Sequence, residues 1–564
     1  MPAATDPAAP LADAARNGAP RPKAPNDRLA FRSSRSPVLG TRGLVASSQP
    51  LATAAGLRML REGGNATDAA VAAAAALAVT EPVMTGLGGD CFALVHDAST
   101  RRVHALNGSG RAPAALDLAR LERDGVRGEM PRFHAHTVTV PGAFAGWCDA
   151  LERHGSLPLD SVLAPAIELA EEGFPVAPIT AELWKLARFQ LDASPGGRAL
   201  QIDGRAPAPG ERFRNADLAR TLRALAEGGR AAFYEGDVAR AIERVVRDHG
   251  GALAAADLAE HASTFEDPIS LEYRGLRVWE CAPNGQGLAA LIALGLVRGL
   301  DLASLDPLGP ERFHAMIEAM RLAFADARAF VADPAHARVP VDELLSETYL
   351  ARRRDAIDPS RANPGALAGR PLAGSDTVYL CAVDAAGNAC SFINSNYQFF
   401  GTGLVPEGCG FALQNRGAGF SLDPRHPNVV APRKRPYHTI IPGMLTHADD
   451  GALFGPFGVM GGFMQPQGHL QVVVALADDG EDPQSALDRP RFQLPGGEAG
   501  DAVQLEEGLP ADTLRALAAR GHETQVLGGL GRASFGRGQI VQRTRDGVLW
   551  GGSDPRADGC AMPL

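Results

Sequence analysis

The side chains best placed to do chemistry are a threonine and a serine on the two arms of an expected β-hairpin. The runs 378–383 and 389–395 are rich in apolar, aromatic and β-branched residues, and Asp384-Ala-Ala-Gly-Asn388 supplies the turn. Symmetrical pairing of the arms sets Thr377 opposite Ser395. Because opposed Cβ atoms in an antiparallel pair lie about 5 Å apart, the two hydroxyls can share a hydrogen bond. The same register pairs Tyr379 with Ile393, Cys381 with Ser391, and Val383 with Ala389.

A threonine at this position suits a chain that cuts itself. The preceding residues, 362–376, are rich in Pro, Gly and Ala and are expected to form an exposed loop. A threonine hydroxyl is a poor nucleophile without a base, and the sequence shows no recognisable relay beside Thr377. Cleavage between Asp376 and Thr377 would free an α-amino group, and its pKa of about 7.7–8.0 makes it a base. The alternative is an ordinary surface threonine, which an isolated Asp-Thr-Val-Tyr sequence favours.

Short motifs along the rest of the chain strengthen the first interpretation. Their order and spacing resemble those of the γ-glutamyltranspeptidase (glutathione hydrolase) family, from Gly40 to the C-terminus. Each motif is weak alone, whereas the ordered set is specific. The family motifs are Glu62-Gly-Gly-Asn-Ala-Thr-Asp-Ala-Ala70, Gly86-Leu-Gly-Gly-Asp90, Val140-Pro-Gly142, Asp376-Thr377, Phe400-Gly-Thr-Gly403, Arg435-Pro436, Met460-Gly-Gly462 and Ser553-Asp-Pro-Arg556. Three more resemble its glutathione hydrolase-like proenzyme branch: Leu106-Asn-Gly-Ser-Gly-Arg-Ala-Pro113, Gln414-Asn-Arg-Gly417 and Met464-Gln-Pro-Gln-Gly468.

The resemblance implies an α+β fold, a four-layer αββα sandwich of the N-terminal-nucleophile hydrolase type, made as a proenzyme. It divides the chain into a large subunit, 40–376, and a small subunit, 377–564, which stay together as one interwoven unit. Thr377 would be the nucleophile, and Ser395 stands where better-known members have a second threonine. Gly461 and Gly462 match the glycine pair whose amides hold the oxyanion, a role that suits residues without Cβ. A tight turn is the alternative reading of that pair. No metal or other cofactor is implied.

Departures from the family pattern fall on the residues that would hold the donor. Tyr397 replaces an asparagine, while Arg416 and Gly419 replace the glutamine and aspartate that grip the donor's α-amino group. An arginine cannot accept a hydrogen bond from an ammonium, and glycine has no side chain to offer one. We therefore expect the α-amino contact to be made differently or to be missing.

The donor carboxylate has two candidate receptors in the sequence. Arg111 lies two places beyond the family's arginine, where Ser109 aligns strictly, and Arg416 is the second candidate; a guanidinium fork suits a carboxylate. A solvated or structural arginine is the alternative for each. The neighbouring Asn415 is included among the substrate-binding candidates. His438 and Thr439 replace two serines that position the donor carboxylate and the scissile carbonyl, and both keep donor capacity.

The activity implied is cleavage of γ-glutamyl amides, such as glutathione, with water or an amine as acceptor. Residues 421–435 form a shorter connection than the lid of many members, so we expect an open site that favours hydrolysis over transfer. One alternative is an amidohydrolase of the same fold acting on a glutaryl-cephalosporin or oxamate-like acyl group. Another is a non-catalytic scaffold protein. A homodimer of processed heterodimers is a further expectation.

Composition agrees with a large globular protein. The chain has 564 residues, is 45% hydrophobic and 21% charged, and its formal charge of −10 argues against nucleic-acid binding. The seven cysteines show no metal-ligand spacing, and we expect no disulfide between Cys381 and Cys390. Residues 1–39 read as a disordered leader without an apolar signal region, and no apolar run is long enough to span a membrane. We therefore expect a cytoplasmic protein.

Periodic apolar residues predict most of the helices in the large subunit. The sequence Gly63-Gly64-Asn65 is expected to end one helix and cap the next. Pro283-Asn-Gly-Gln-Gly287 resembles a phosphate-binding loop only superficially, since it lacks a third glycine. Expected helices are 51–62, 66–79, 159–172, 215–227, 237–249, 310–332, 481–489 and 509–520. Expected strands besides the hairpin are 91–96, 276–280 and, more weakly, 137–140.

Overall fold

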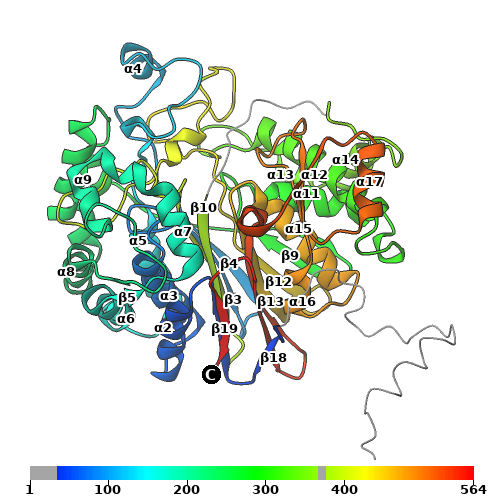
Figure 1. Ribbon diagram of the computed structural model, residues 1–564, viewed down its shortest axis with the longest axis horizontal. Helices are drawn as coiled ribbons and strands as arrows, with labels where there is room; N and C mark the ends of the chain where they lie inside the picture. The colour runs from blue at the N-terminus through cyan, green and yellow to red at the C-terminus, as the bar shows by residue number, and fades with distance from the viewer. Residues whose placement is uncertain (1–34, 366–375) are drawn as a thin grey trace, which may run out of the picture.

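Two seven-stranded antiparallel sheets lie face to face, and helices cover the outer side of each (Figure 1). This is a computed structural model, and it describes residues 35–365 and 376–564. In Figure 1 the sheets stand between one group of helices on the left and another on the right. The arrangement confirms the predicted α+β fold, a four-layer αββα sandwich of the N-terminal-nucleophile hydrolase type.

The two sheets mix strands from distant parts of the chain. Sheet A runs in the order β1 (Val38–Gly40), β18 (Leu549–Ser553), β17 (Arg537–Arg543), β13 (Leu453–Met460), β12 (Gly443–His447), β9 (Leu276–Glu280) and β8 (Ile269–Tyr273). Sheet B runs in the order β19 (Cys560–Pro563), β2 (Gly43–Ser47), β10 (Asp376–Asp384), β11 (Ala389–Tyr397), β3 (Asp90–Asp97), β4 (Arg102–Gly108) and β7 (Thr264–Glu266). Smaller sheets are formed by β14 (Phe492–Gln493), β15 (Val503–Glu506) and β16 (Thr524–Leu527), and by β5 (Phe174–Pro175) and β6 (Arg212–Phe213).

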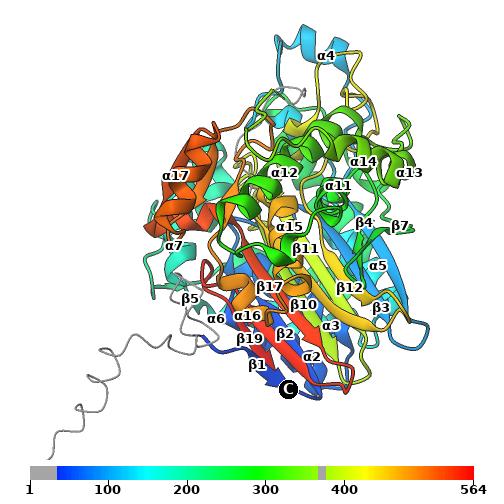
Figure 2. The same cartoon turned by 90° about the vertical axis from the view of Figure 1, so that its right-hand side faces the viewer.

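Helices of two groups bury the outer faces of the sheets. Sheet B is covered by α2 (Pro50–Arg61), α3 (Ala66–Thr80) and α5 (Ala143–His154), and α6 (Leu159–Glu172) and α8 (Ala216–Tyr234) pack on the outside of these helices. Sheet A is covered by α11 (Gly287–Arg298), α12 (Pro310–Phe330), α15 (Met464–Ala477) and α16 (Pro483–Asp488), which lie in front of it in Figure 2. The remaining helices are α4 (Leu118–Arg123), α7 (Pro178–Ala187), α9 (Asp237–Asp248), α10 (Ala255–Ala259), α13 (Val341–Leu344), α14 (Glu347–Arg354) and α17 (Ala511–Ala519).

Helix α3 shows how the sequence supports this packing. Every residue of α3 is buried, because it lies between sheet B and helices α2 and α6. Alanine, its main residue, is the best helix former and is small enough for close approach on all sides. Asn65 caps the helix by accepting hydrogen bonds from the amides of Thr67 and Asp68, and Gly63 follows α2 with a φ of 91°. The predicted stop and cap are confirmed.

Two sequence expectations need correction. Val38 and Leu39, expected to belong to the disordered leader, are in β1, which pairs with β18. Residues 1–34 of that leader, and most of the expected loop before Thr377, lie outside the described residues. The weak strand over 137–140 is absent from the described structure. Instead residues Ala135–Thr137 form a turn of 3-10 helix, because the His134 side chain accepts from the His136 amide and Thr137 bonds back to the His134 carbonyl.

Among the described residues, no helix combines the length and apolar character needed to cross a bilayer. All seven cysteines are free thiols. Cys390 pairs with Ala382 in the hairpin, one position away from Cys381, in agreement with the predicted register.

Candidate active site

The hairpin predicted from the sequence is formed by β10 and β11 at the centre of sheet B. Besides Thr377 with Ser395, the sequence predicts three pairs, and the register contains all of them: Tyr379 with Ile393, Cys381 with Ser391, and Val383 with Ala389. The register shifts between Asp376 and Val378, so that Asp376 pairs with Tyr397. Thr377 lies in this irregularity and is fully buried. Its hydroxyl donates to the Ser395 hydroxyl across 3.2 Å, which confirms the predicted contact.

The guanidinium of Arg416 contacts one of these two hydroxyls. Arg416 begins a short 3-10 helix, Arg416–Gly419, and its side chain is fully buried. One guanidinium nitrogen donates to the Thr439 hydroxyl across 2.8 Å, and the other lies 3.4 Å from the Ser395 hydroxyl. Burial lowers the pKa of Arg416 to about 10, so the group is still charged at neutral pH. No carboxylate of the described chain forms an ion pair with it, which leaves a buried positive charge beside Thr377.

The ring of Tyr397 packs against the guanidinium of Arg416. The guanidinium carbon lies 4.0 Å from the centre of the Tyr397 ring, a cation–π contact. The Tyr397 backbone has a φ of 79°, a conformation costly for an aromatic residue, and its amide donates to the Ser395 hydroxyl across 2.8 Å. The unfavourable backbone conformation thus turns the amide toward Ser395 while placing the ring beneath the guanidinium.

Asp90 and His438 form a buried pair next to Arg416. His438 Nε2 lies 3.0 Å from one Asp90 carboxylate oxygen, and the other oxygen accepts from the amides of Gly110 and Gly142 and from Gln414. Burial, together with the charge of Arg416, lowers the pKa of His438 to about 3 against the opposing effect of Asp90. Burial alone would raise the pKa of Asp90, but its hydrogen bond from His438 and the Arg416 charge outweigh that effect and lower it. We conclude that neutral His438 donates to ionised Asp90.

Gly461 and Gly462 connect β13 to α15 on the opposite sheet. Their φ values of 133° and 61° are ones that residues with a Cβ rarely adopt. Within the described part of the chain, neither amide N–H donates a hydrogen bond to another residue. Three residues later, Gln465 Nε2 lies 3.4 Å from the Thr377 hydroxyl. The turn from β13 into α15 therefore lies beside Thr377, and the two amides are available to a substrate oxygen.

Several residues of the site were not identified from the sequence. Gln286 donates to the backbone carbonyls of Thr439 and Gly462, across 2.6 and 2.8 Å, and so joins the two segments that flank Thr377. It belongs to the loop dismissed above as a phosphate site. Asp90 and Gln465 both lie inside motifs that carry the family resemblance. Only their membership in these motifs could have drawn attention to them, because nothing in the local sequence indicates their partners.

The side chains of Arg111 and Asn415 contact residues other than Thr377 and Ser395. Arg111 is about one-third exposed, lies 3.5 Å from Asp333, and donates to the Arg433 carbonyl. Asn415 donates to the Arg132 carbonyl and to the Gln398 side chain, and it accepts from the Gln398 amide. The side chain of Asn415 is thus used within the protein. A substrate-binding role for either residue stays a prediction, and of the two candidate arginines only Arg416 contacts Ser395.

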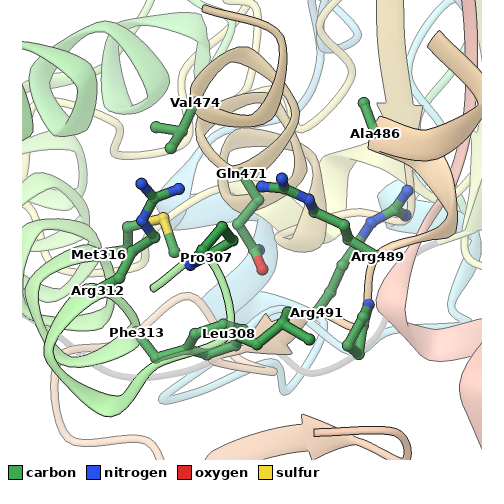
Figure 3. Close-up of a pocket in the computed structure, with 11 residues that line it drawn as sticks. Pro307, Leu308, Arg312, Phe313, Met316, Gln471, Val474, Ala486, Arg489 and Arg491 are labelled. Atoms are coloured by element: carbon green, nitrogen blue, oxygen red, sulfur yellow. The ribbon is translucent and has the colours of Figure 1, made fainter. Parts of the chain in front are cut away.

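A separate pocket lies between α12, α15 and α16 (Figure 3). Three arginines line it, but each is already neutralised: Arg312 pairs with Asp479, Arg489 with Asp479 and Glu481, and Arg491 with Asp554. The pocket shares no residue with the surroundings of Thr377. We therefore do not assign it to the candidate active site.

Comparisons with known proteins agree with the geometry. The chain is 36% identical over 537 residues to the glutathione hydrolase-like YwrD proenzyme of Bacillus subtilis, with 93% of this chain and 99% of the relative covered. It is 36% identical over 532 residues to the oxamate amidohydrolase proenzyme of Klebsiella pneumoniae, with 93% and 98% covered. Among solved structures, the cephalosporin acylase from Bacillus halodurans superposes with a TM-score of 0.88 at 45% identity, covering 97% of this chain and 99% of that chain.

A family model extends these similarities over almost the whole chain. The model described as gamma-glutamyltranspeptidase matches residues 52–564, which include both sheets except β1 and β2 and every residue of the candidate site. With the αββα sandwich and the Thr377 hairpin in place, this match shows that the chain belongs to the gamma-glutamyltranspeptidase family of N-terminal-nucleophile hydrolases.

Proposed function

We propose that the chain is an autoprocessing hydrolase with Thr377 as nucleophile, cleaving amides whose acyl group ends in a carboxylate. γ-Glutamyl amides, including glutathione, belong to this class of donor. The observation that carries the proposal is the buried guanidinium of Arg416, which has no ion-pair partner among the described residues and lies next to the hydroxyls of Ser395 and Thr439. A buried charge without a direct ion-pair partner costs several kcal/mol, and a substrate carboxylate would supply that partner.

The processing step follows from the position of Thr377. Its hydroxyl oxygen attacks the carbonyl carbon of Asp376, the C–N bond to Thr377 breaks, and an ester forms while the threonine nitrogen becomes a free amine. Water then hydrolyses the ester. The products are pieces 40–376, preceded by the N-terminal residues, and 377–564. The Ser395 hydroxyl, 3.2 Å away, accepts the hydrogen bond that orients the attacking oxygen.

The same oxygen serves in turnover. The freed amine takes the hydroxyl proton, the oxygen attacks the substrate amide, and an acyl-enzyme forms as the amine leaving group departs. Gly461 and Gly462 provide amides for the oxyanion, and Arg416 holds the distal carboxylate. The connection over 421–435 is too short to form a lid over the site, so we expect the site to stay open to solvent. This supports water as the main acceptor.

A specific observation favours a second candidate donor. Arg416 and Gly419 offer no acceptor for an α-ammonium, and Asp90, the carboxylate that acts electrostatically on Arg416, is already bound by four donors. A donor without the α-amino group, such as a glutaryl amide or oxamate, avoids this difficulty. The oxamate amidohydrolase and the cephalosporin acylase among the similar proteins support the same alternative.

Two measurements test the proposal. Mass spectrometry of the purified chain should show two pieces, one with Thr377 at its N-terminus, whereas an uncut chain would support a non-catalytic scaffold. The matured protein should then be assayed on γ-glutamyl, glutaryl, oxamate and butyryl amides side by side. We expect the carboxylate-bearing donors to be hydrolysed and the butyryl amide, which has no carboxylate, to be poor. Equal rates on all four would contradict the proposal.

Ser395→Ala should slow maturation. The substitution removes the acceptor of the Thr377 hydroxyl, and one hydrogen bond of this kind corresponds to roughly a 2- to 10-fold change in rate. The appearance of the two pieces can be followed on denaturing gels after synthesis is stopped. Ser395→Thr, which keeps a hydroxyl, is the matched control and should mature at close to the original rate. Unchanged maturation of the alanine variant would refute this role.

The pH profile should identify the base. If the freed amine of Thr377 is the base, kcat/KM should rise with pH through a single limb near the pKa of an α-amino group, about 7.7–8.0. His438 should contribute no limb near pH 6.5, since burial lowers its pKa to about 3. His438→Gln should therefore lower activity without moving the limb. A limb that disappears in His438→Gln would assign the proton transfer to the histidine.

A further inference from the structure

A second group of chemically active side chains lies on the outer side of sheet A. His314 and Glu318 are one helical turn apart on α12 and so share a face of that helix, and His522 follows α17. Each side chain is almost completely buried. One ligand atom from each lies within 4.8 Å of the other two. None of these residues contacts Thr377 or belongs to the candidate active site.

The hydrogen bonds of His314 leave one nitrogen as a ligand. Its Nε2 lies 2.7 Å from the backbone carbonyl oxygen of Asp358, and because a carbonyl only accepts, this nitrogen carries the proton. Nδ1 therefore has a free lone pair, and it faces Nε2 of His522 at 2.8 Å. Histidines that bind metals commonly donate their second N–H to a backbone carbonyl in this way, which fixes the ring.

His522 and Glu318 each present a buried atom that lacks a hydrogen-bond partner among the described residues. These atoms are Nδ1 of His522 and Oε1 of Glu318. His522 can move its proton to Nδ1 and so turn Nε2 into a second ligand. The other carboxylate oxygen of Glu318 accepts from the Asn363 amide at 3.0 Å. Oε1, which lies 3.4 Å from Nε of Arg321, is then the oxygen left to act as a third ligand.

The charges around the group are compatible with a cation. Arg321 lies 3.4 Å from Glu318, and it also donates to the carbonyls of Ala499 and Asp501. Arg520 pairs with Glu311 and donates to the Pro359 carbonyl. Arg520 therefore has a carboxylate partner outside the group, whereas Arg321 is paired with Glu318 itself and is held in addition by two backbone carbonyls. Two imidazoles and one carboxylate form a ligand set that Zn²⁺ favours, with a fourth position left for water.

We propose that His314, Glu318 and His522 bind one Zn²⁺ ion that ties residues 358–363 to helix α12 and to the end of α17. The chain is anchored at both ends of this segment, by Asp358 on His314 and by Asn363 on Glu318. Zinc bonds of about 2.0–2.2 Å require the two ring nitrogens to separate by about 0.5 Å from their present contact, a shift that side-chain rotation provides. The role is structural, and it strengthens the attachment of the segment that leads toward the processing site.

Metal content tests the proposal. The full chain is treated with chelator, dialysed against ZnCl₂ and analysed by mass spectrometry for bound zinc and by calorimetric titration. We expect one equivalent of zinc per chain. Glu318→Gln and His522→Ala should bind at least about tenfold more weakly. His154→Ala is the matched control, since His154 is a half-buried histidine beside another, His104, at 5.2 Å between ring centres, and it should keep full zinc binding.

A second readout separates a lost site from a lost fold. Hydrogen exchange in residues 356–363 should slow when zinc is added to the original chain and should not respond in Glu318→Gln. Circular dichroism of the metal-free variants should match that of the original chain. Stoichiometric zinc in Glu318→Gln and His522→Ala equal to the original would overturn the proposal, and so would the absence of stoichiometric zinc in the original chain.

Discussion

Replacing Thr377 with alanine should give a chain that is neither cut nor active. In the proposed mechanism the hydroxyl attacks in both reactions, and the amine that serves as base in turnover is released only by the first of them. Loss of a nucleophile in a hydrolase costs on the order of 10⁴- to 10⁶-fold in kcat. A denaturing gel should show one band of full length, and hydrolysis of every acyl donor should fall to background.

Thr377→Ser is the matched control for this prediction. It keeps an oxygen at the position that contacts Ser395, so the variant should mature, more slowly, and retain part of the activity. A Thr377→Ala chain that still separates into two pieces would place the cut elsewhere. A mature alanine variant with normal hydrolysis would remove Thr377 from the mechanism altogether.

Arg416→Gln should lower kcat/KM for carboxylate-bearing donors by about 10²- to 10³-fold, because a buried partner for the substrate charge is lost. Hydrolysis of the butyryl amide should change by less than about tenfold, since that donor has no carboxylate to bind. The folded protein should lose little stability, because removing a buried charge that lacks a carboxylate partner also removes its desolvation cost. Steady-state kinetics with paired donors and thermal melts provide the two measurements.

Arg111→Gln decides between the two candidate carboxylate receptors. Arg111 is partly exposed and paired with Asp333, so we expect this variant to keep kcat/KM within a few-fold of the original. Arg416→Lys should recover only part of the activity, because lysine keeps the charge but loses the fork and the stacking on Tyr397. A large loss in Arg111→Gln with none in Arg416→Gln would exchange the roles of the two arginines.

Local patterns in the sequence predicted much of the fold. The amphipathic helix over 159–172 and the strand over 276–280 have the predicted bounds, because each has one buried face with a clear period. Helix α15 was not predicted, since nearly all of its residues are buried and its sequence therefore has no polar face to reveal the period. Apolar periodicity therefore predicts half-buried helices and strands better than fully buried ones.

The candidate site was predictable only where residues lie close together in sequence. Thr377 and Ser395 are only 18 positions apart, on the two arms of one hairpin, so their contact follows from the local sequence. The contact between Asp90 and His438 joins residues 348 positions apart, and no periodicity carries that information. Tyr397 was noted as a departure from the family. Its position beneath Arg416 depends on a backbone conformation that no residue preference indicates.

The arrangement of strands has a consequence for a molecule whose backbone is broken before Thr377. Hairpin β10–β11 lies between β2 and β3, β19 pairs with β2, and in the other sheet β18 pairs with β1 and β12 with β9. In every one of these ladders the two strands come from opposite sides of the break. Covalent continuity would then be dispensable: the two polypeptides should co-migrate on a native column and separate only in strong denaturant.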